Sequence, residues 1–560
     1  MKRTLITLAL FATIVAAQSQ SPPSGGMRPV TDPGAPARVG VGITERSLAL
    51  EEAIQLALAN NLDIDIERTA RDTAIQNVQV AQGLFDPTFR WAPLFTSDNL
   101  PVASLLQGAG GKLTTRNFSS NASLRQRLPR YGTTGFLDFN NLRSTTTNPF
   151  ASFNPALTSF LAVGVTQPIL RNFRIDRERA EIRVRQKQVD LAGVDLETRV
   201  IDIVTRTQQA YYDLVAARES VAVSQEQVSL GREQLAINQR LVETGTLAMV
   251  EISAAEAELQ RRVDTWYSSL AIVTEAENSL KILISPERAA SIWNDVIVPT
   301  DESLLQPATA DLREALATAI RRRPELRSVS VQNEINGVQK ELNANLRRPE
   351  VNAIAQYSMN GLAGSLSNIP NPFANQNTPV YDRLNALSAA QGLPPVASPS
   401  FGTVPTSLIG NYGTALSNLF GGNYQSFQVG VSMDFNLRNR SAEASYGQTL
   451  INEKRLRLEK ARAEQLIEAQ VRNALQNIET SRQRIAAAEA SAKAAQEKLQ
   501  SERRLYETGE STNFLVLTRQ NEYADSRRRT VVARLDFNKS VARLEQALGT
   551  TLAVHRITVD

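Results

Sequence analysis

Apolar residues recur every seven positions through two long stretches of the chain, one in each half. In the stretch 179–244 the repeating positions are Val200, Leu214, Val221, Val228, Leu235 and Val242. In the second half they are Val471, Ile478, Ile485, Ala492, Leu499 and Tyr506. Alanines occupy many companion positions, and small residues in such a seam let helices pack closely. The pattern predicts one helix of about 66 to 70 residues in each half.

Shorter helical patterns flank each long one. Seven-residue spacing resumes after Gly245 and ends near Ser285, and the stretches 48–82 and 311–347 are also helical by pattern. Ser47 and Asp311 are plausible caps at the starts of those two stretches. Each short helix has about 35 residues, so two placed end to end match the roughly 100 Å length of the long helix. We therefore expect rods of antiparallel helices.

Between the helical stretches the apolar period changes to two, which is typical of strands. The clearest strands are 426–435 and 351–360, and their counterparts in the first half are 86–95 and 157–167. Each has roughly 10 residues, the length of an outer-membrane strand. Two further alternating runs, 117–128 and 134–146, either belong to the same sheet or form an outer hairpin, and the pattern does not decide which. The segment 360–423 has no sustained period and is predicted to be an outward loop.

One unit occurs twice in the chain. The segment Leu241-Val242-Glu243-Thr244-Gly245 recurs as Leu505-Tyr506-Glu507-Thr508-Gly509, and 509 − 245 gives an offset of 264 residues. Other pairs keep nearly the same offset, so we expect two pseudo-symmetric halves. The predicted division is a signal peptide (1–17), an N-terminal extension (18–47), a first repeat (48–284), an inter-repeat equatorial linker (285–310), a second repeat (311–548) and a C-terminal tail (549–560).

The first residues indicate export. Lys2 and Arg3 precede a largely apolar segment that ends in the small residues Val15-Ala16-Ala17, a pattern typical of a cleaved signal peptide. The chain has no cysteine, so we expect neither disulfides nor a lipid anchor. The formal net charge is +4, and removing Lys2 and Arg3 leaves 4 − 2 = +2, too little to favour nucleic-acid binding.

Candidate catalytic groups are scarce. The sole histidine, His555, lies close to the C-terminus and is interpreted as a surface residue. No glycine-rich phosphate loop is visible, and the scattered carboxylates lie mainly on helices beside Arg or Lys. We expect no enzymatic activity, no cofactor and no metal site.

Several short motifs resemble those of the TolC-type outer-membrane efflux proteins. The segment from Leu50 to Asn61 resembles the family's opening helix, and Phe85-Asp86-Pro87 its turn into the first strand. Gln167-Pro168-Ile169-Leu170-Arg171 resembles the exit from the second strand, and the sequences around Gly245 and Gly509 resemble periplasmic hairpin turns. The resemblance implies a mainly α fold with β structure: a homotrimer with four strands per chain in one membrane β-barrel, continued by a long periplasmic α-helical coiled-coil barrel.

The resemblance also implies a function and partners. Such proteins are passive exit channels for tripartite efflux pumps or type I secretion systems, located in the outer membrane of Gram-negative-type bacteria with a large periplasmic portion. They dock on a periplasmic adaptor protein that links them to an inner-membrane pump. The docking candidates in this chain are Thr244, Gly245, Thr246, Leu247, Thr508, Gly509, Glu510 and Ser511.

The chain departs from the family pattern past the second tip. Some members carry carboxylates there that narrow the closed end, whereas this chain has Leu515-Val516-Leu517-Thr518, so an acidic gate does not carry over. Glu251 and Glu256 follow the first tip and are interpreted as residues of an exposed helix face. The alternative to a channel is a non-channel periplasmic adaptor or a coiled-coil structural protein, which would explain the heptads but not the amphipathic strands.

Overall fold

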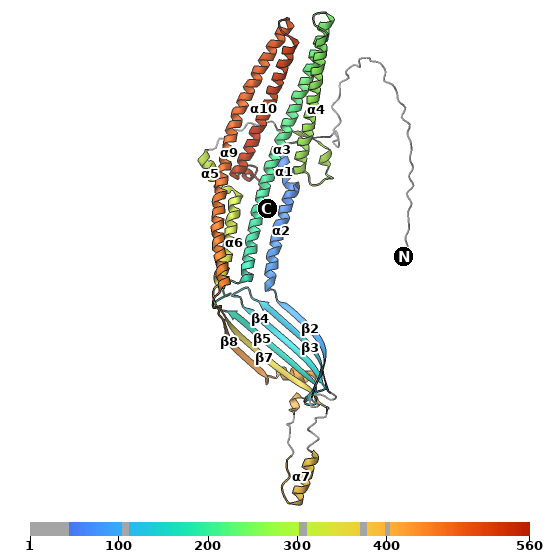
Figure 1. The fold of residues 1–560 in the computed structure, drawn as a ribbon, viewed down its shortest axis with the longest axis vertical. Helices are drawn as coiled ribbons and strands as arrows, with labels where there is room; N and C mark the ends of the chain where they lie inside the picture. Colours follow the sequence, from blue (N-terminus) through green and yellow to red (C-terminus); the bar gives the residue numbers. More distant parts are fainter. Residues whose placement is uncertain (1–43, 104–110, 302–310, 370–377, 398–403, 560) are drawn as a thin grey trace, which may run out of the picture.

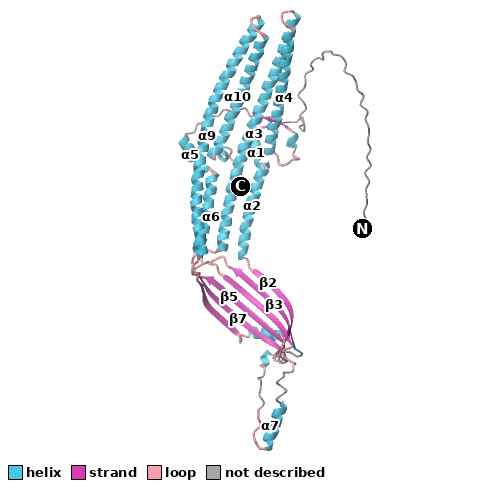
Figure 2. Cartoon of the chain, in the orientation of Figure 1, coloured by secondary structure: helices cyan, strands magenta, loops and turns pink. Residues whose placement is uncertain are grey.

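The structure, a computed structural model, describes residues 44–103, 111–301, 311–369, 378–397 and 404–559. The chain is elongated, with long helices at one end and a sheet at the other (Figure 1). Figure 2 shows how sharply the two kinds of structure are separated along the long axis. In these residues no helix is both long and apolar enough to cross a membrane.

The two halves follow nearly the same order of elements. The first half runs α1 (Leu50–Asn60), α2 (Leu62–Gln82), β2 (Thr88–Pro101), β3 (Lys112–Arg127), β4 (Thr134–Thr146), β5 (Phe153–Pro168), α3 (Arg177–Glu243) and α4 (Val250–Ile284). The second half runs α5 (Leu312–Arg322), α6 (Pro324–Leu346), β7 (Glu350–Leu366), α7 (Thr378–Ala390), α8 (Tyr412–Phe420), β8 (Gln425–Asp434), α9 (Arg440–Glu507) and α10 (Asn513–Leu548). The predicted long helices and the internal duplication are therefore confirmed.

The first short helix of each half is broken, where the sequence pattern predicted a continuous helix. The breaks lie at Asn61 and Arg323, whose backbone is extended, with ψ angles of 121° and 124°. Asn61 caps α2 by accepting a hydrogen bond from the backbone of Asp63, and Arg323 precedes Pro324, which disfavours helical backbone in the residue before it. The prediction failed because apolar periodicity continues across a one-residue break.

Both breaks are held by equivalent contacts. The Asn61 side-chain amide donates to the carbonyl of Leu283 at 3.0 Å, and the Arg323 guanidinium donates to the carbonyl of Gln546 at 2.9 Å. Asn61 and Arg323 are 262 residues apart, and their acceptors are 263 apart, since 323 − 61 = 262 and 546 − 283 = 263. The duplication therefore extends to individual side-chain interactions.

The main sheet has six strands among the described residues, in the order β2-β3-β4-β5-β7-β8, and every neighbouring pair is antiparallel. The prediction of four strands per chain is wrong. The undecided runs 117–128 and 134–146 correspond to β3, except for Leu128, and to β4. These strands pair with each other and with β2 and β5. A sequence shows that a strand alternates but does not show with which strand it pairs, and that is why the count was too low.

The sequence pattern predicted a plain loop between β7 and β8, but the structure shows two helices there. The segment contains α7, which projects beyond the sheet on the side away from the long helices (Figure 1), and α8, which packs on β7. The approach of α8 is close, because a Cβ added at Gly361 would lie 2.2 Å from the carbonyl oxygen of Ala415. Glycine at this position is what lets α8 lie against the strand.

Each half has its own apolar core where its helices meet. In the first half the core gathers around Ile203, Tyr211 and Leu214 of α3, and in the second around Val471 and Ile478 of α9. The seam residues predicted from the heptads are buried or half-buried in both halves. The core thus forms from the seven-residue pattern, as coiled-coil packing requires.

A small second sheet joins the start of the described chain to the segment between the repeats. β1 (Glu45–Leu48) pairs in parallel with β6 (Val296–Pro299). The fully buried Lys281 of α4 donates to the carbonyls of Trp293 and Asp295 in the same segment, at 3.1 and 2.6 Å. These contacts fix the inter-repeat segment to the first half. The predicted signal peptide lies outside the described residues.

Candidate docking tips and channel wall

The two predicted tips have the same backbone geometry. At the first tip the amides of Gly245 and Thr246 donate to the carbonyls of Val242 and Leu241, at 3.0 and 2.9 Å. Gly245 has a φ angle of +74°, which glycine adopts without strain. This pattern is a Schellman motif, in which a left-handed residue ends a helix by satisfying its last carbonyls.

The second tip repeats the motif. The amides of Gly509 and Glu510 donate to the carbonyls of Tyr506 and Leu505, at 3.1 and 2.8 Å, and Gly509 has a φ angle of +79°. The tips differ after the glycine, because Thr512 caps α10 whereas α4 begins without a side-chain cap. Both turns lie at the end of the molecule farthest from the sheet (Figure 1).

The structure brings the eight predicted docking residues to one end of the helical layer, in two separate turns. Leu247 and Ser511 are half-buried and the other six are exposed. Sequence reasoning missed the apolar side chains beside them: Met249, Val250 and Phe514 are 77%, 68% and 73% exposed. The tip surface therefore combines small polar turn residues with large apolar ones.

Directly behind the tips, polar side chains join the two helical hairpins α3–α4 and α9–α10. The Gln234 amide of α3 donates to Asn513 of α10 at 3.1 Å, and Asn513 donates to the Glu251 carboxylate of α4 at 2.9 Å. The Tyr506 hydroxyl of α9 donates to Asn238 at 3.1 Å. Glu251 is thus half-buried and bonded within the chain, and its interpretation as part of an exposed face is wrong.

A second polar layer lies farther from the tips, around the buried Arg262 of α4. Its guanidinium donates to the carbonyl of Gln227 at 3.1 Å, to the side chain of Gln520 at 2.9 Å and to Glu258 at 3.1 Å. Burial raises the pKa of Glu258, but hydrogen bonds from Arg261, Asn521 and Arg262 outweigh it and lower that pKa to about 2. The layer is therefore charged at neutral pH and links α3, α4 and α10.

The six-stranded sheet has one apolar and one polar face. Residues that pair directly across antiparallel strands share a face. One such row crosses all six strands as Phe89, Leu124, Leu137, Val163, Tyr357 and Phe427. The adjacent row on the opposite face is Arg90, Ser123, Asp138, Ala162, Ser358 and Ser426. Such a sheet can separate a lipid phase from water.

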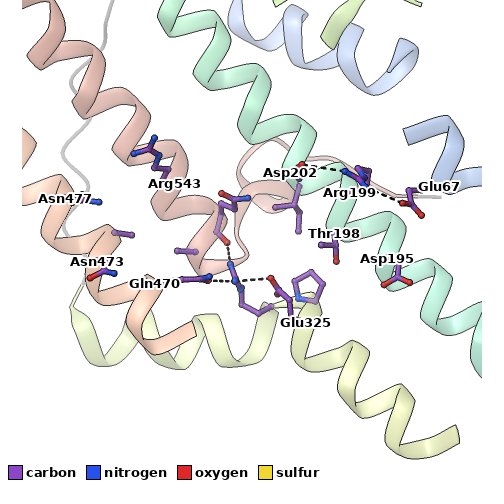
Figure 3. A pocket seen from close by; sticks show the side chains of 16 residues that line it. Glu67, Asp195, Thr198, Arg199, Asp202, Glu325, Gln470, Asn473, Asn477 and Arg543 are labelled. Atoms are coloured by element: carbon purple, nitrogen blue, oxygen red, sulfur yellow. Dashed lines mark hydrogen bonds and ion pairs between the residues drawn. The ribbon is translucent and has the colours of Figure 1, made fainter. Parts of the chain in front are cut away.

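A polar groove with a volume of about 760 Å³ lies between the two halves, near the breaks in the short helices. Figure 3 shows Glu67, Asp195 and Asp202 on one side of it and Gln470 and Asn473 on the other. Burial, together with the charge of Glu67, raises the pKa of Asp195. Among the residues that the structure describes, no group of His, Cys, Asp or Glu could hold a metal ion.

His555 is not a surface residue, contrary to the interpretation from sequence. Its side chain is 11% exposed, and Nε2 lies 2.6 Å from the Gln208 amide nitrogen and 3.5 Å from the Glu545 carboxylate. Nδ1 lies 3.5 Å from the Glu51 carboxylate. Hydrogen bonding to Glu545 is the main cause of the raised pKa of His555, against the opposing effect of burial. The C-terminal tail thereby joins both halves.

Comparison with known proteins supports the resemblance seen in the motifs. The chain matches the model of a family described as "Outer membrane efflux protein" over residues 125–284 and 398–550, together more than half of its length. One matched segment falls in each half, which agrees with the duplication. No curated protein matches the sequence.

Solved structures of outer-membrane channels share the fold. The Campylobacter jejuni CmeC channel is 13% identical, with a TM-score of 0.59 over 90% of this chain and 86% of that one. VceC of Vibrio cholerae is 12% identical, with a TM-score of 0.58 over 89% and 96%. The Neisseria gonorrhoeae MtrE channel is 13% identical, with a TM-score of 0.55 over 90% and 89%. At these identities the similarity shows the fold alone.

Proposed function

The chain belongs to the outer membrane efflux protein family, and from that premise we propose that three copies form a passive exit duct from the periplasm to the exterior. The family consists of transport proteins, so the chain is not an enzyme. More specifically, we propose that the duct serves a tripartite efflux pump or a type I secretion system. A periplasmic adaptor would bind its tips, and an inner-membrane pump would lie behind the adaptor.

One observation carries this proposal: the sheet has an apolar face, a polar face and two open edges, β2 and β8. In hydrocarbon, each unpaired backbone amide costs several kcal/mol, so a sheet with free edges is not stable there. Association of identical chains removes the edges by closing a barrel. The apolar row would then contact lipid, and the polar row would line a water-filled lumen.

The helical layer extends that wall away from the membrane. α2, α3, α6 and α9 all reach the end of the sheet and contact one another in that order (Figure 1). The long helices α3 and α9 then continue to the tips, about 100 Å away at 1.5 Å per residue. A duct of this length supports docking on a periplasmic partner rather than direct contact with the inner membrane.

The channel itself is tested by fractionation and conductance. The protein should fractionate with outer membranes, migrate on a gel as a heat-sensitive trimer and conduct ions when inserted into a planar lipid bilayer. A monomeric protein found only in the soluble periplasm would contradict the proposal and favour the adaptor or structural alternative.

Docking at the tips is tested by adding bulk to the exposed turns. We expect Thr246→Trp and Glu510→Trp to abolish export while folded trimers persist in the membrane, because both side chains are exposed and make no core contacts. Ala487→Trp is the matched control, since Ala487 is exposed on α9 and lies 22 residues before Gly509, about 33 Å along the helix. Full export by both tip variants would remove these residues from the docking surface.

A further inference from the structure

We infer that the trimer closes an eighteen-stranded barrel, in which β8 of one copy pairs with β2 of the next, and that this barrel admits hydrated polar cargo too wide for a twelve-stranded duct. The inference rests on the proposed trimeric channel and concerns its width. It depends on the six strands per chain rather than on the four that the family resemblance implied.

The extra hairpin β3–β4 is part of the wall. β3 pairs with β2 and β4, and β4 pairs with β5, through continuous registers without a bulge. The apolar row passes through Leu124 and Leu137, and the polar row through Ser123 and Asp138, so both faces continue across the hairpin. A hairpin that folded over the mouth would interrupt these rows.

The two free edges are suited to pair with each other between copies. β2 follows α2 and runs away from the helices, whereas β8 leads into α9 and runs toward them. An even number of antiparallel strands makes the edge strands antiparallel, so identical copies arranged in a ring pair edge to edge in the same up-and-down pattern. The pairing also joins apolar face to apolar face, since Phe89 of β2 and Phe427 of β8 share one row.

The number of strands sets the diameter of a β-barrel. With strands about 4.8 Å apart and tilted by about 40°, eighteen strands give a backbone diameter of about 36 Å and twelve give about 24 Å. Side chains occupy roughly 5 Å on each inner wall. The resulting lumens are about 26 Å and about 14 Å across.

The helical layer favours the wider ring. Four helices per chain meet the sheet, so a trimer would place twelve helices around the axis, and at about 9 Å spacing their ring has a circumference of about 110 Å. Eighteen tilted strands span about 113 Å, whereas twelve span about 75 Å. A six-stranded sheet therefore continues the helical wall with little change in radius.

The polar face indicates the cargo class. Its side chains are mainly small and uncharged, such as Ser123, Asn121, Asn140, Gln356 and Ser358. Apolar side chains such as Leu94 and Leu142 lie on this face too, but polar ones such as Ser119 separate them, so the lumen has no continuous apolar surface to retain greasy molecules. It also has no single-sign field to select ions. It suits bulky hydrated solutes, including oligosaccharides and folded peptides.

The direct test is a cryo-electron microscopy map of the purified trimer in lipid nanodiscs. Eighteen strands, with β8 beside β2 of the neighbouring copy, are expected. A trimer with twelve strands and the β3–β4 hairpin outside the wall would overturn the width inference but leave the channel proposal intact. A monomeric soluble protein would instead overturn the channel proposal.

The functional test compares the full chain with a variant in which residues 102–152 are replaced by a short glycine-rich turn. β2 and β5 are antiparallel, so they can pair directly once the hairpin is removed. Neutral polyethylene glycols of graded size are added on the side of the barrel mouth, and the largest polymer that still lowers the conductance is recorded. The cut-off radius should be nearly twofold larger for the full chain, and equal cut-offs in two folded trimers would refute the inference. The strand count of the unmodified trimer decides the matter if the variant does not fold.

Discussion

Two adjacent arginines of α4 bind the same carboxylate but differ in burial, which makes a sharp test of what the polar layer contributes. Arg261 and Arg262 both contact Glu258, at 2.6 and 3.1 Å. The Arg261 side chain is 60% exposed, and that of Arg262 is 4% exposed. We expect Arg262→Ala to destabilise the packing of the two hairpins strongly and Arg261→Ala to change it little.

The magnitudes follow from the partners that each substitution leaves behind. Removing Arg262 leaves the Gln227 carbonyl and the Gln520 side chain without their buried donor and deprives Glu258 of one of its cations. Breaking such a buried pair costs about 3 to 5 kcal/mol. The exposed Arg261 contact is screened by water and is worth at most about 1 kcal/mol.

Hydrogen exchange measures this difference locally. Opening of α3 near Gln227 and of α10 near Gln520 should become about 100-fold more frequent in Arg262→Ala, since 3 kcal/mol corresponds to roughly two powers of ten. Arg261→Ala should change the same amides by no more than about fivefold. Arg262→Met keeps an aliphatic side chain but has no hydrogen-bond donor, so it should show most of the increase in exchange seen in Arg262→Ala. Equal exchange in the two alanine variants would refute the argument that burial decides the contribution.

Three further outcomes are expected. The pKa of His555 is raised, so its contact with Glu545 stabilises the C-terminal tail fully below about pH 6.5, and this stabilisation is lost as pH rises through the pKa of His555 in the folded protein. Proteolysis of the tail should therefore increase over this pH range, and His555→Gln should abolish the pH dependence. Gly361→Val should displace α8, because its Cβ would meet the helix backbone at 2.2 Å, and protease sensitivity of residues 404–424 should increase while the trimer persists. Gly509→Ala should lower the melting temperature, since φ is +79° there, at a cost of about 1 kcal/mol. Gly447→Ala, two turns into α9 and with open space around its Cβ, should raise it.

Much of the helical architecture could be predicted from the sequence. The heptads place α3 and α4 within a few residues of their observed ends, and the repeat of the seam in the second half predicts a long helix there that the structure shows as α9. Coiled-coil packing imposes the same short pattern along the whole helix, so it can be read from the sequence. The glycines of the tips could be predicted for the same reason, since a long helix that reverses direction needs a residue with positive φ. The breaks in the short helices were only weakly indicated by the sequence. The indications were an asparagine that can cap a helix at Asn61 and a proline directly after Arg323.

The sheet and the tail could not be predicted to the same depth. The alternation in 117–128 and 134–146 was visible, but strand pairing depends on contacts distant in sequence, so the strand count stayed open. His555 carries no periodic signal, and its burial results from the tail folding back against α1, α3 and α10. In both cases the missing information was which distant segments meet.

The heptad pattern does indicate where the two polar layers lie, because polar residues replace apolar ones at seam positions. Asn238 continues the companion frame of α3 from Ala217, and Arg262 continues that of α4 from Ala255. A polar residue at a seam position lowers stability but fixes register, because each donor must meet its own acceptor. The apolar cores gather farther from the tips, whereas the two hairpins are joined by hydrogen bonds near the tips. If Gly245 and Gly509 belong to one docking surface, the two turns must keep fixed relative positions. The hydrogen-bonded layer directly behind them, backed by the Arg262 layer farther along, is the physical means of keeping that distance constant.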